Sequence, residues 1–268
     1  NIRKILDFTG FDFQTYVVDW EAMAAAQLAL LRSGVANADA VQDHIIFTVV
    51  DRVARSTGIR YVLTGSNMAT EAILPEAWGY SAMDGVFLKT VIRRFTGISA
   101  TRLPLRRWHE HYPEMQVRKV TYVSPLDGLG YEKVTAVEEL RARIGWSDYG
   151  LKHHESSWTG YFQSYWLPRR FGYDKRKAHF SSLIVSGQLQ RTVAVEMLRK
   201  PLFPERDLPR TEQYIADKLG ISVTELQEIK EAPLRSHLDF LRLETLEDAA
   251  GITLLRRLLK PIKRRILG

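Results

Sequence analysis

The alternation of apolar and polar residues predicts helices over much of the first third of the chain. Apolar residues recur at helical spacing in residues 2–9, in the alanine- and leucine-rich stretch 21–33, and in residues 43–57. A glycine follows each stretch and can end the helix there. Asp43 is the expected N-cap of the third helix. The expected buried face of that helix consists of Ile45, Ile46, Val49, Val50 and Val53.

Short stretches rich in aromatic and β-branched residues predict strands between these helices. Residues 11–20, FDFQTYVVDW, and residues 59–65, IRYVLTG, both suit buried strands. A third strand is expected within residues 117–124, where Pro125 ends it. Helices that alternate with short apolar strands indicate a parallel sheet with covering helices, so we expect an α/β fold.

Helices predominate in the second half of the sequence. The expected helices are residues 133–145, 192–200, 207–220 and 222–232. Residues 146–171 are dense in aromatic side chains, most of which are expected in a core. We therefore divide the chain into an α/β region (1–145), an aromatic-rich and mostly helical region (146–232), and a basic helical tail (233–268).

Composition and charge narrow the classes of function. The 268 residues include no cysteine, which excludes disulfides, thiolate metal sites and a cysteine nucleophile within this chain. No apolar run approaches the ~18 residues of a membrane-spanning helix. The absence of cysteine fits a cytoplasmic protein, which is the location we expect. The formal net charge of +7 favours anionic partners such as nucleotides, phosphorylated substrates, nucleic acid or acidic lipid.

The stretch YVLTGSNMATE, residues 61–71, places polar groups directly after an expected strand. In parallel sheets, ligands bind beyond the carboxyl ends of the strands. Gly65 allows a ligand to approach the backbone, and Ser66 and Asn67 can donate hydrogen bonds to phosphate or ribose oxygens. Glu71 can hold Mg²⁺ or a hydroxyl group. An ordinary strand-to-helix connection, capped by Ser66 or Asn67, explains the same pattern.

A second polar cluster lies within residues 152–188. Its first part comprises Lys152, His153, His154 and Glu155. Its second part is a cationic segment, Lys175, Arg176 and Lys177, followed by the apolar residues Phe180, Leu183 and Ile184. Clustered cations beside apolar anchors suit a phosphate clamp, and nearby aromatic rings can stack on a sugar or a base. The rings can equally be core residues, and two adjacent histidines are weak support for a metal site.

The end of the chain is strongly basic. Residues 252–268, ITLLRRLLKPIKRRILG, combine six cations with apolar faces and contain no acid. Such a segment can lie on anionic lipid as an interfacial helix, which would give a peripheral membrane contact. It can equally be a terminal helix docked on its own protein, and Pro261 would kink either form.

Four motifs resemble the N-acetyl sugar amidotransferase family, which serves lipopolysaccharide O-antigen synthesis and flagellin sugar modification. They are TYVVDW, TGSNMATEAILPEAWGY, GWSDYGLKHHES and LPRRFGYDKRKAHFSSLIVSGQ. The resemblance runs from about residue 1 to about residue 232. It implies a parallel-sheet PP-loop ATPase domain (adenine nucleotide alpha hydrolase-like), followed by a mainly α-helical C-terminal region.

The resemblance implies that a sugar acetamido group becomes an acetamidino group. ATP would adenylylate the amide oxygen, and ammonia would attack the activated carbon and expel AMP. The activation is needed because an amide is a poor electrophile. The implied cofactors are ATP and Mg²⁺. The implied partners are a nucleotide-linked N-acetyl sugar and a glutaminase that supplies ammonia, since this chain has no cysteine for that task. Nucleic acid is not an expected partner.

The resemblance also implies roles for the two polar clusters. Catalysis would use Lys175, Lys177 and His179, with His179 moving protons as ammonia attacks. ATP would contact Gly65, Ser66, Asn67, Glu71 and Arg176. The sugar would contact Lys152, His153, His154, Glu155, Ser181, Ser182 and Gln188.

One departure from the family keeps other interpretations open. The SGGxDS-type pyrophosphate loop of the family does not occur in these 268 residues. We therefore expect the chain to be a C-terminal portion of the enzyme, incomplete at the N-terminus of its PP-loop domain and inactive without that loop. The alternatives are a non-catalytic binding or scaffold module, and an RNA-modifying PP-loop protein, which the basic charge would suit.

Overall fold

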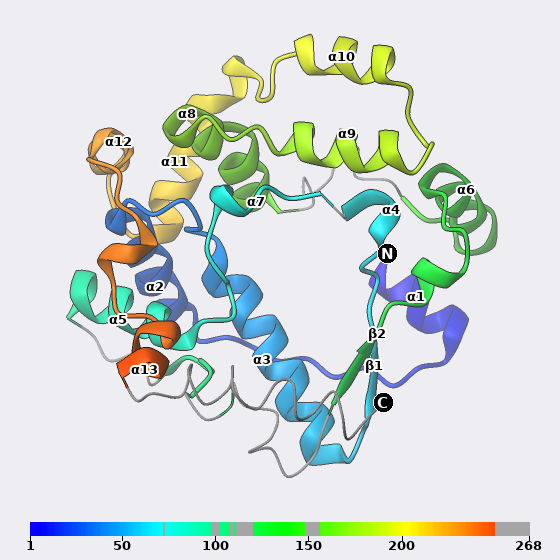
Figure 1. The fold of residues 1–268 in the computed structure, drawn as a ribbon, viewed down its shortest axis with the longest axis horizontal. Coiled ribbons are helices and arrows are strands. Elements are labelled where there is room, and N and C mark those ends of the chain that lie inside the picture. Colours follow the sequence, from blue (N-terminus) through cyan, green and yellow to red (C-terminus); the bar gives the residue numbers. More distant parts are fainter. Residues whose placement is uncertain (72, 98–101, 108–109, 111–119, 148–155, 250–268) are drawn as a thin grey trace. The chain divides into compact units, whose positions relative to one another are not determined.

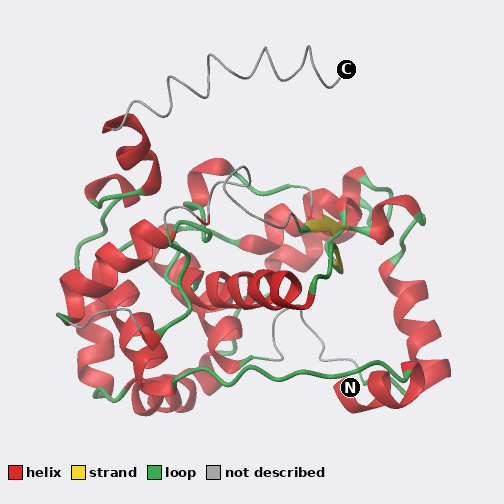
Figure 2. Cartoon of the chain, turned by 90° about the horizontal axis from the view of Figure 1, so that it is seen from below, coloured by secondary structure: helices red, strands yellow, loops and turns green. Residues whose placement is uncertain are grey.

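The structure is a computed structural model that describes residues 1–71, 73–97, 102–107, 110, 120–147 and 156–249. Most of these residues are helical, and the strands among them form one short parallel sheet (Figure 1, Figure 2). The strands are β1 (Tyr61–Leu63) and β2 (Thr121–Val123). The expected α/β class thus holds in the form of a mainly helical chain with a small parallel sheet.

The bounds of the helices are as follows. The α-helices are α1 (Ile2–Thr9), α2 (Trp20–Ser33), α3 (Ala40–Thr57), α4 (Met68–Glu71), α5 (Gly85–Thr96), α6 (Lys133–Ile144), α7 (Ser157–Tyr161), α8 (Leu167–Phe171), α9 (Lys175–Val185), α10 (Arg191–Arg199), α11 (Leu208–Leu219), α12 (Val223–Glu231) and α13 (Leu243–Ala249). Single 3-10 turns are Glu76–Trp78, Pro125–Gly128, Glu205–Asp207 and His237–Asp239, and a π-helical turn spans Phe162–Trp166.

The chain forms two compact units, each built from three separate stretches. The first unit comprises Asn1–Val18, Asp51–Gly79 and Arg118–Glu231. The second unit comprises Asp19–Val50, Tyr80–Val117 and Ala232–Gly268.

In the second unit, α2 packs against α5. Ala26, Ala29 and Leu30 of α2 and Phe87 and Leu88 of α5 are completely buried. The small alanine side chains let the two helices approach closely, which explains the alanine-rich composition of α2. Helix α2 ends before Gly34, as the sequence predicts.

Asp84 joins three segments of the second unit. Its Oδ1 accepts hydrogen bonds from the N–H groups of Val86 (2.8 Å) and Phe87 (3.0 Å) and so caps α5. Its Oδ2 accepts from the Tyr80 hydroxyl (2.6 Å) and from the N–H of Leu243 (2.7 Å). Burial and this contact with Asp84 raise the pKa of Tyr80. The buried carboxylate is therefore well supplied with donors.

The buried face of α3 differs from the predicted one. The helix begins at Ala40, so Asp43 lies in its first turn and is not its N-cap. The buried face consists of Val41, His44, Ile45, Thr48, Asp51 and Ala54. Of the predicted face only Ile45 is buried, and Ile46 is 58 % exposed. Of the polar residues on this face, His44 bonds to the backbone on both sides of its ring, whereas the buried Thr48 hydroxyl has no hydrogen-bond partner among the described residues. His44 Nδ1 donates to the carbonyl of Ala82 (2.9 Å), and its Nε2 accepts from the N–H of Arg106 (2.8 Å).

In the first unit, β1 and β2 pair in parallel with Tyr61 opposite Thr121 and Leu63 opposite Val123. Both strands were predicted, but the predicted burial of the first is wrong. The side chains of Tyr61 and Leu63 are 65 % and 72 % exposed. A two-stranded sheet leaves much of each strand's surface uncovered unless other elements pack on it.

Residues 11–19 form a loop, so the predicted buried strand there is wrong. Phe11 and Val17 are 72 % and 83 % exposed. A strand needs a neighbour to accept its backbone hydrogen bonds, and no described segment pairs with this one. The last two residues of the predicted strand belong to the start of α2. Asp19 accepts a hydrogen bond from the N–H of Ala22 and caps this helix, and Trp20 is its first residue.

The aromatic region forms a core, as predicted, around α7, the π-helical turn and α8. Tyr161, Phe162 and Trp166 are buried. The N–H of Leu167 bonds to the carbonyl of Phe162, which is a π-helical bond, and the next residue, Pro168, has no N–H to continue an α-helical ladder. The proline therefore accounts for the local widening of the helix.

A buried ionic cluster links this aromatic core to α11 and α12. The Glu212 carboxylate accepts hydrogen bonds from the Tyr161 hydroxyl (3.0 Å), the Lys230 ammonium (3.1 Å) and the Gln227 amide (2.6 Å). The side chains of Glu212 and Lys230 are only 6 % and 7 % exposed. Burial and the negative charge of Glu212 raise the pKa of Tyr161. The sequence predicts the helices but not this cluster.

Candidate functional site

The two polar clusters of the sequence meet where α4 packs against α9 in the first unit (Figure 1). His179 Nδ1 donates to the carbonyl of Thr70 (2.9 Å). The Ser182 hydroxyl accepts from the N–H of Ile73 (3.0 Å), and the Ser186 hydroxyl donates to the carbonyl of Ala69 (2.9 Å). His179 and Ser182 lie on α9 and Ser186 directly follows it; we call these three side chains the α4–α9 clamp. The clamp fixes the backbone just beyond β1.

Of the expected ATP contacts, Asn67 serves the local fold. Its Oδ1 accepts from the N–H (2.9 Å) and the hydroxyl (3.0 Å) of Thr70, so it caps α4. The side chain is 8 % exposed. The capped strand-to-helix connection considered from the sequence therefore exists. Ser66 and Gly65 are exposed, and a Cβ added at Gly65 would meet no heavy atom within 4 Å.

The end of β2 lies beside the end of β1, as parallel pairing requires. The hydroxyls of Thr64 and Ser124 are 3.2 Å apart, and Asp127 Oδ1 accepts from the N–H of Met68 (2.7 Å). The turn after β2 thus binds the first residue of α4. The sequence analysis missed residues 127–132, although the rule that selected residues 65–71 applies equally to the polar turn LDGLGYE after the second strand.

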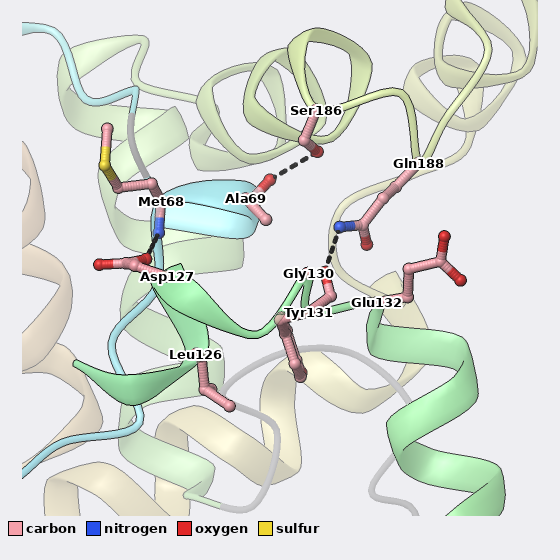
Figure 3. A pocket seen from close by; sticks show the side chains of 9 residues that line it. All are labelled: Met68, Ala69, Leu126, Asp127, Gly130, Tyr131, Glu132, Ser186 and Gln188. Carbon is pink, nitrogen blue, oxygen red and sulfur yellow. Dashed lines mark hydrogen bonds between the residues drawn. The ribbon is translucent and has the colours of Figure 1, made fainter.

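A pocket opens between these two turns and the end of α9 (Figure 3). Its volume is about 280 Å³, and it is lined by Met68, Ala69, Leu126, Asp127, Gly130, Tyr131, Glu132, Ser186 and Gln188. The Gln188 amide donates to the carbonyl of Tyr131 (2.8 Å), and its Oε1 accepts from the N–H of Lys133 (3.3 Å). Gln188, an expected sugar contact, therefore holds the wall of this pocket.

Tyr131 is the aromatic side chain of the pocket. Partial burial raises the pKa of its hydroxyl, and the nearby negative charge of Glu71 adds to the effect. The hydroxyl therefore stays protonated at neutral pH. Glu71, expected to hold Mg²⁺ or a hydroxyl, lies close enough to act on this wall of the pocket.

The cationic segment starts α9, and its three members have different surroundings. Asp174 caps the helix and pairs with Arg176 at 2.9 Å. The Arg176 guanidinium also donates to the carbonyls of Leu198 (3.3 Å) and Lys200 (2.8 Å), at the end of α10. Arg176 thus ties α9 to α10. Lys175 is half-buried and Lys177 is exposed, and neither forms an ion pair within the described parts of the chain.

The serines of α9 are largely occupied by the helix itself. The Ser181 hydroxyl donates to the carbonyl of Lys177 (2.7 Å), and the Ser182 hydroxyl donates to that of Ala178 (3.2 Å). Ser182 is 2 % exposed, so its hydroxyl is out of reach of a ligand in this structure. Ser181 is half-buried.

The helical rise separates the cations from the pocket. From Lys175 to Ser186 the chain advances eleven residues, which is roughly 16 Å at 1.5 Å per residue. Lys175 and Lys177 therefore cannot contact the same small group as Ser186 and Gln188. The expected site is divided between the two ends of α9.

Several expectations concern residues outside the described part of the chain. They are the sugar contacts Lys152, His153, His154 and Glu155, and the basic segment 252–268. Within the described residues, no three His, Cys, Asp or Glu side chains are grouped closely enough to hold a metal ion. The helices of the described ranges include none with the length and apolarity needed to cross a bilayer.

Comparison with known proteins identifies one part of the chain. Residues 155–251 match the family model described as "LPS biosynthesis protein WbpG-like, C-terminal domain". No curated protein and no solved structure matches the chain. The matched residues run from the start of α7 to the end of α13 and include α9 with all side chains of the α4–α9 clamp. Residues 155–251 are therefore similar to the C-terminal domain of WbpG-like LPS biosynthesis proteins.

Proposed function

We propose that the chain forms part of an ATP-dependent amidotransferase that converts an N-acetyl sugar to its acetamidino derivative for LPS. The family match supports a role in LPS sugar biosynthesis. The reaction itself comes from the resemblance of residues 1–232 to N-acetyl sugar amidotransferases, and it is the reading that the site supports best.

The observation that carries this proposal is the α4–α9 clamp. The motifs TGSNMATE and KRKAHFSSLIVSGQ are more than a hundred residues apart in the sequence, yet His179, Ser182 and Ser186 bind the backbone of residues 69–73. The contact lies at the carboxyl ends of two parallel strands, where α/β proteins bind their ligands.

In the proposed reaction, ATP adenylylates the amide oxygen with release of pyrophosphate, and ammonia displaces AMP. Lys175 and Lys177 are the proposed contacts of phosphate groups, because they carry charge without an acidic partner among the described residues. Mg²⁺ would arrive with ATP and take at most one or two carboxylates of the protein, of which Glu71 is the candidate. His179 is the proposed proton carrier, in the Nδ1-protonated form that its bond to Thr70 fixes.

Ammonia is proposed to come from a separate glutaminase. Most free ammonia is protonated at neutral pH and is then not nucleophilic. The chain contains no cysteine that could hydrolyse glutamine. The enzyme should therefore use high ammonium at raised pH, use glutamine poorly, and regain glutamine-dependent turnover when the partner is added.

The test is the stoichiometry of the reaction. The enzyme that contains this chain is incubated with ATP, ammonium and a nucleotide-linked N-acetyl sugar. We expect AMP and pyrophosphate to form only when the sugar is present, and we expect the sugar product to show the mass change of oxygen replaced by NH. Pyrophosphate release that does not depend on the sugar, or that depends on transfer RNA, would reject the proposal.

A further inference from the structure

The pocket at the ends of β1 and β2 has the wrong charge for a phosphate. Its walls carry two carboxylates, those of Asp127 and Glu132, and no lysine, arginine or histidine. A phosphate there would meet negative charge and would find no charge-assisted donor. The cations of α9 lie at the opposite end of that helix, roughly 16 Å away.

The same walls offer acceptors to hydroxyl groups. One oxygen of Asp127 accepts from the N–H of Met68, and one oxygen of Glu132 accepts from the Thr135 hydroxyl (3.1 Å). The second oxygen of each carboxylate has no donor among the described residues. In Figure 3, Asp127 and Glu132 lie toward opposite ends of the pocket, with Leu126 and Tyr131 between them. Hydroxyls spread around one ring could reach both carboxylates.

The remaining wall suits the carbon skeleton of such a ring. Tyr131 and Leu126 contribute apolar surface, and the protonated Tyr131 hydroxyl can donate a hydrogen bond. The volume of about 280 Å³ lies just below the ~300–1,000 Å³ range of small-molecule pockets. This volume suits a single sugar ring better than a whole nucleotide-linked sugar.

We propose that this pocket holds the N-acetyl sugar ring by its hydroxyls, through Asp127, Glu132 and Tyr131, with the diphosphate outside it. The identity of the sugar as the substrate rests on the proposed function, whereas the preference for a neutral, hydroxyl-rich ring rests on the pocket itself. The residues concerned belong to the turn after β2, which the sequence analysis did not select.

The test compares binding of two probes to the 268-residue chain. N-acetylglucosamine and inorganic pyrophosphate are titrated separately while the Tyr131 resonances are followed by NMR. The variants are Asp127→Asn and Glu132→Gln, with Glu138→Gln as the control, because Glu138 is an exposed carboxylate on α6 outside the pocket. In the first variant the amide oxygen can still accept from Met68, so α4 should keep its position. The Glu132 carboxylate accepts from Thr135 in the neighbouring turn of α6 and from no other side chain that the structure describes, so Glu132→Gln provides the test if Asp127→Asn does not fold.

We expect the sugar to perturb Tyr131 and pyrophosphate not to do so. The Kd for the sugar should rise about tenfold in each pocket variant, as for one lost charge-assisted hydrogen bond, and stay unchanged in the control. Absent sugar binding, equal affinity in all variants, or stronger perturbation by pyrophosphate would overturn the inference. Sugar binding to the pocket without sugar-dependent pyrophosphate release would overturn the proposed function alone.

Discussion

At the scale of single residues, Arg176 and Lys177 are neighbours with the same charge and different surroundings. Arg176 binds Asp174 and the last carbonyls of α10, whereas Lys177 is exposed. We predict that Arg176→Met lowers the free energy of unfolding by about 1–2 kcal/mol, because it leaves the part-buried carboxylate of Asp174 and the part-buried carbonyl of Leu198 without their charged donor. Lys177→Met should change it by less than about 0.5 kcal/mol. Urea denaturation of both variants measures the difference, and equal effects would refute the assignment.

The activity of the same cations is a separate prediction. The double variant Lys175→Met, Lys177→Met should reduce sugar-dependent pyrophosphate release by at least about tenfold, since each lost charge-assisted contact to phosphate is worth ~1.5–3 kcal/mol. Its stability should stay close to that of the unchanged chain. A loss of stability with full activity in the folded fraction would instead assign both lysines to the fold.

Two glycines allow a matched comparison. A Cβ at Gly85 would lie 2.3 Å from the carbonyl oxygen of Arg106, whereas a Cβ at Gly65 meets no heavy atom within 4 Å. We predict that Gly85→Ala lowers the melting temperature, with a loss of about 1–3 kcal/mol from overpacking. Gly65→Ala should not lower it. If a ligand approaches the backbone at Gly65, that variant should weaken nucleotide binding while the melting temperature stays constant.

At the scale of elements, the ionic cluster of α11 and α12 makes stability depend on pH. The pKa of Tyr161 is raised by burial and by Glu212, so the folded chain keeps the hydroxyl protonated when the unfolded chain ionises near pH 10. The unfolded state then binds fewer protons than the folded state, and stability falls as the pH rises above about 10. Tyr80 adds an effect of the same sign. In the Tyr161→Phe variant, the free energy of unfolding measured by denaturation should fall less steeply between pH 8 and pH 11. An unchanged dependence on pH would contradict this.

Local signals in the sequence located α1, α2, α3, α6, α10, α11 and α12, but the sequence analysis did not select α5. Helices α1, α2 and α6 end at glycines in the left-handed conformation, a cue that acts within a few residues. The prediction of a strand at residues 11–20 was wrong because strand formation depends on a partner segment, which composition does not reveal. The inner face of α3 was missed because His44 is buried by backbone partners far away in the sequence.

The sequence predicted the two stretches that form the candidate site, but not the contact between them. Strand-end polarity led to residues 65–71, and clustered charge led to α9, but only the structure joins them through His179, Ser182 and Ser186. Arg176 and Asn67 have the polar side chains that a ligand site needs, yet both are held by the protein itself. Sequence alone cannot separate a side chain that binds a ligand from one that caps a helix, because both need the same donors and acceptors.

At the scale of the whole molecule, the matched family segment 155–251 does not coincide with a compact unit. Its last part, from Ala232 onward, belongs to the second unit. There Phe240 packs edge-on against Phe87, and the N–H of Arg235 donates to the carbonyl of Gly34 (2.9 Å). We predict that truncation after Glu231 abolishes cooperative unfolding of the second unit, because Phe87 loses its neighbour. Truncation after Ala249 should keep it, and calorimetry distinguishes the two.

The interleaving of the two units limits how such a protein can diversify. Each unit has a segment before Asp51, and the last segment of each unit ends at Glu231 or later. Any single breakpoint between Asp51 and Glu231 therefore divides both units. A single crossover between two diverged relatives would therefore combine core segments from different proteins in both units, and their side chains would not be complementary in packing. Recombination of short modules is therefore a poor route to new ligand specificities on this scaffold. Point substitutions in the turns at the strand ends, which leave both cores intact, offer the accessible route.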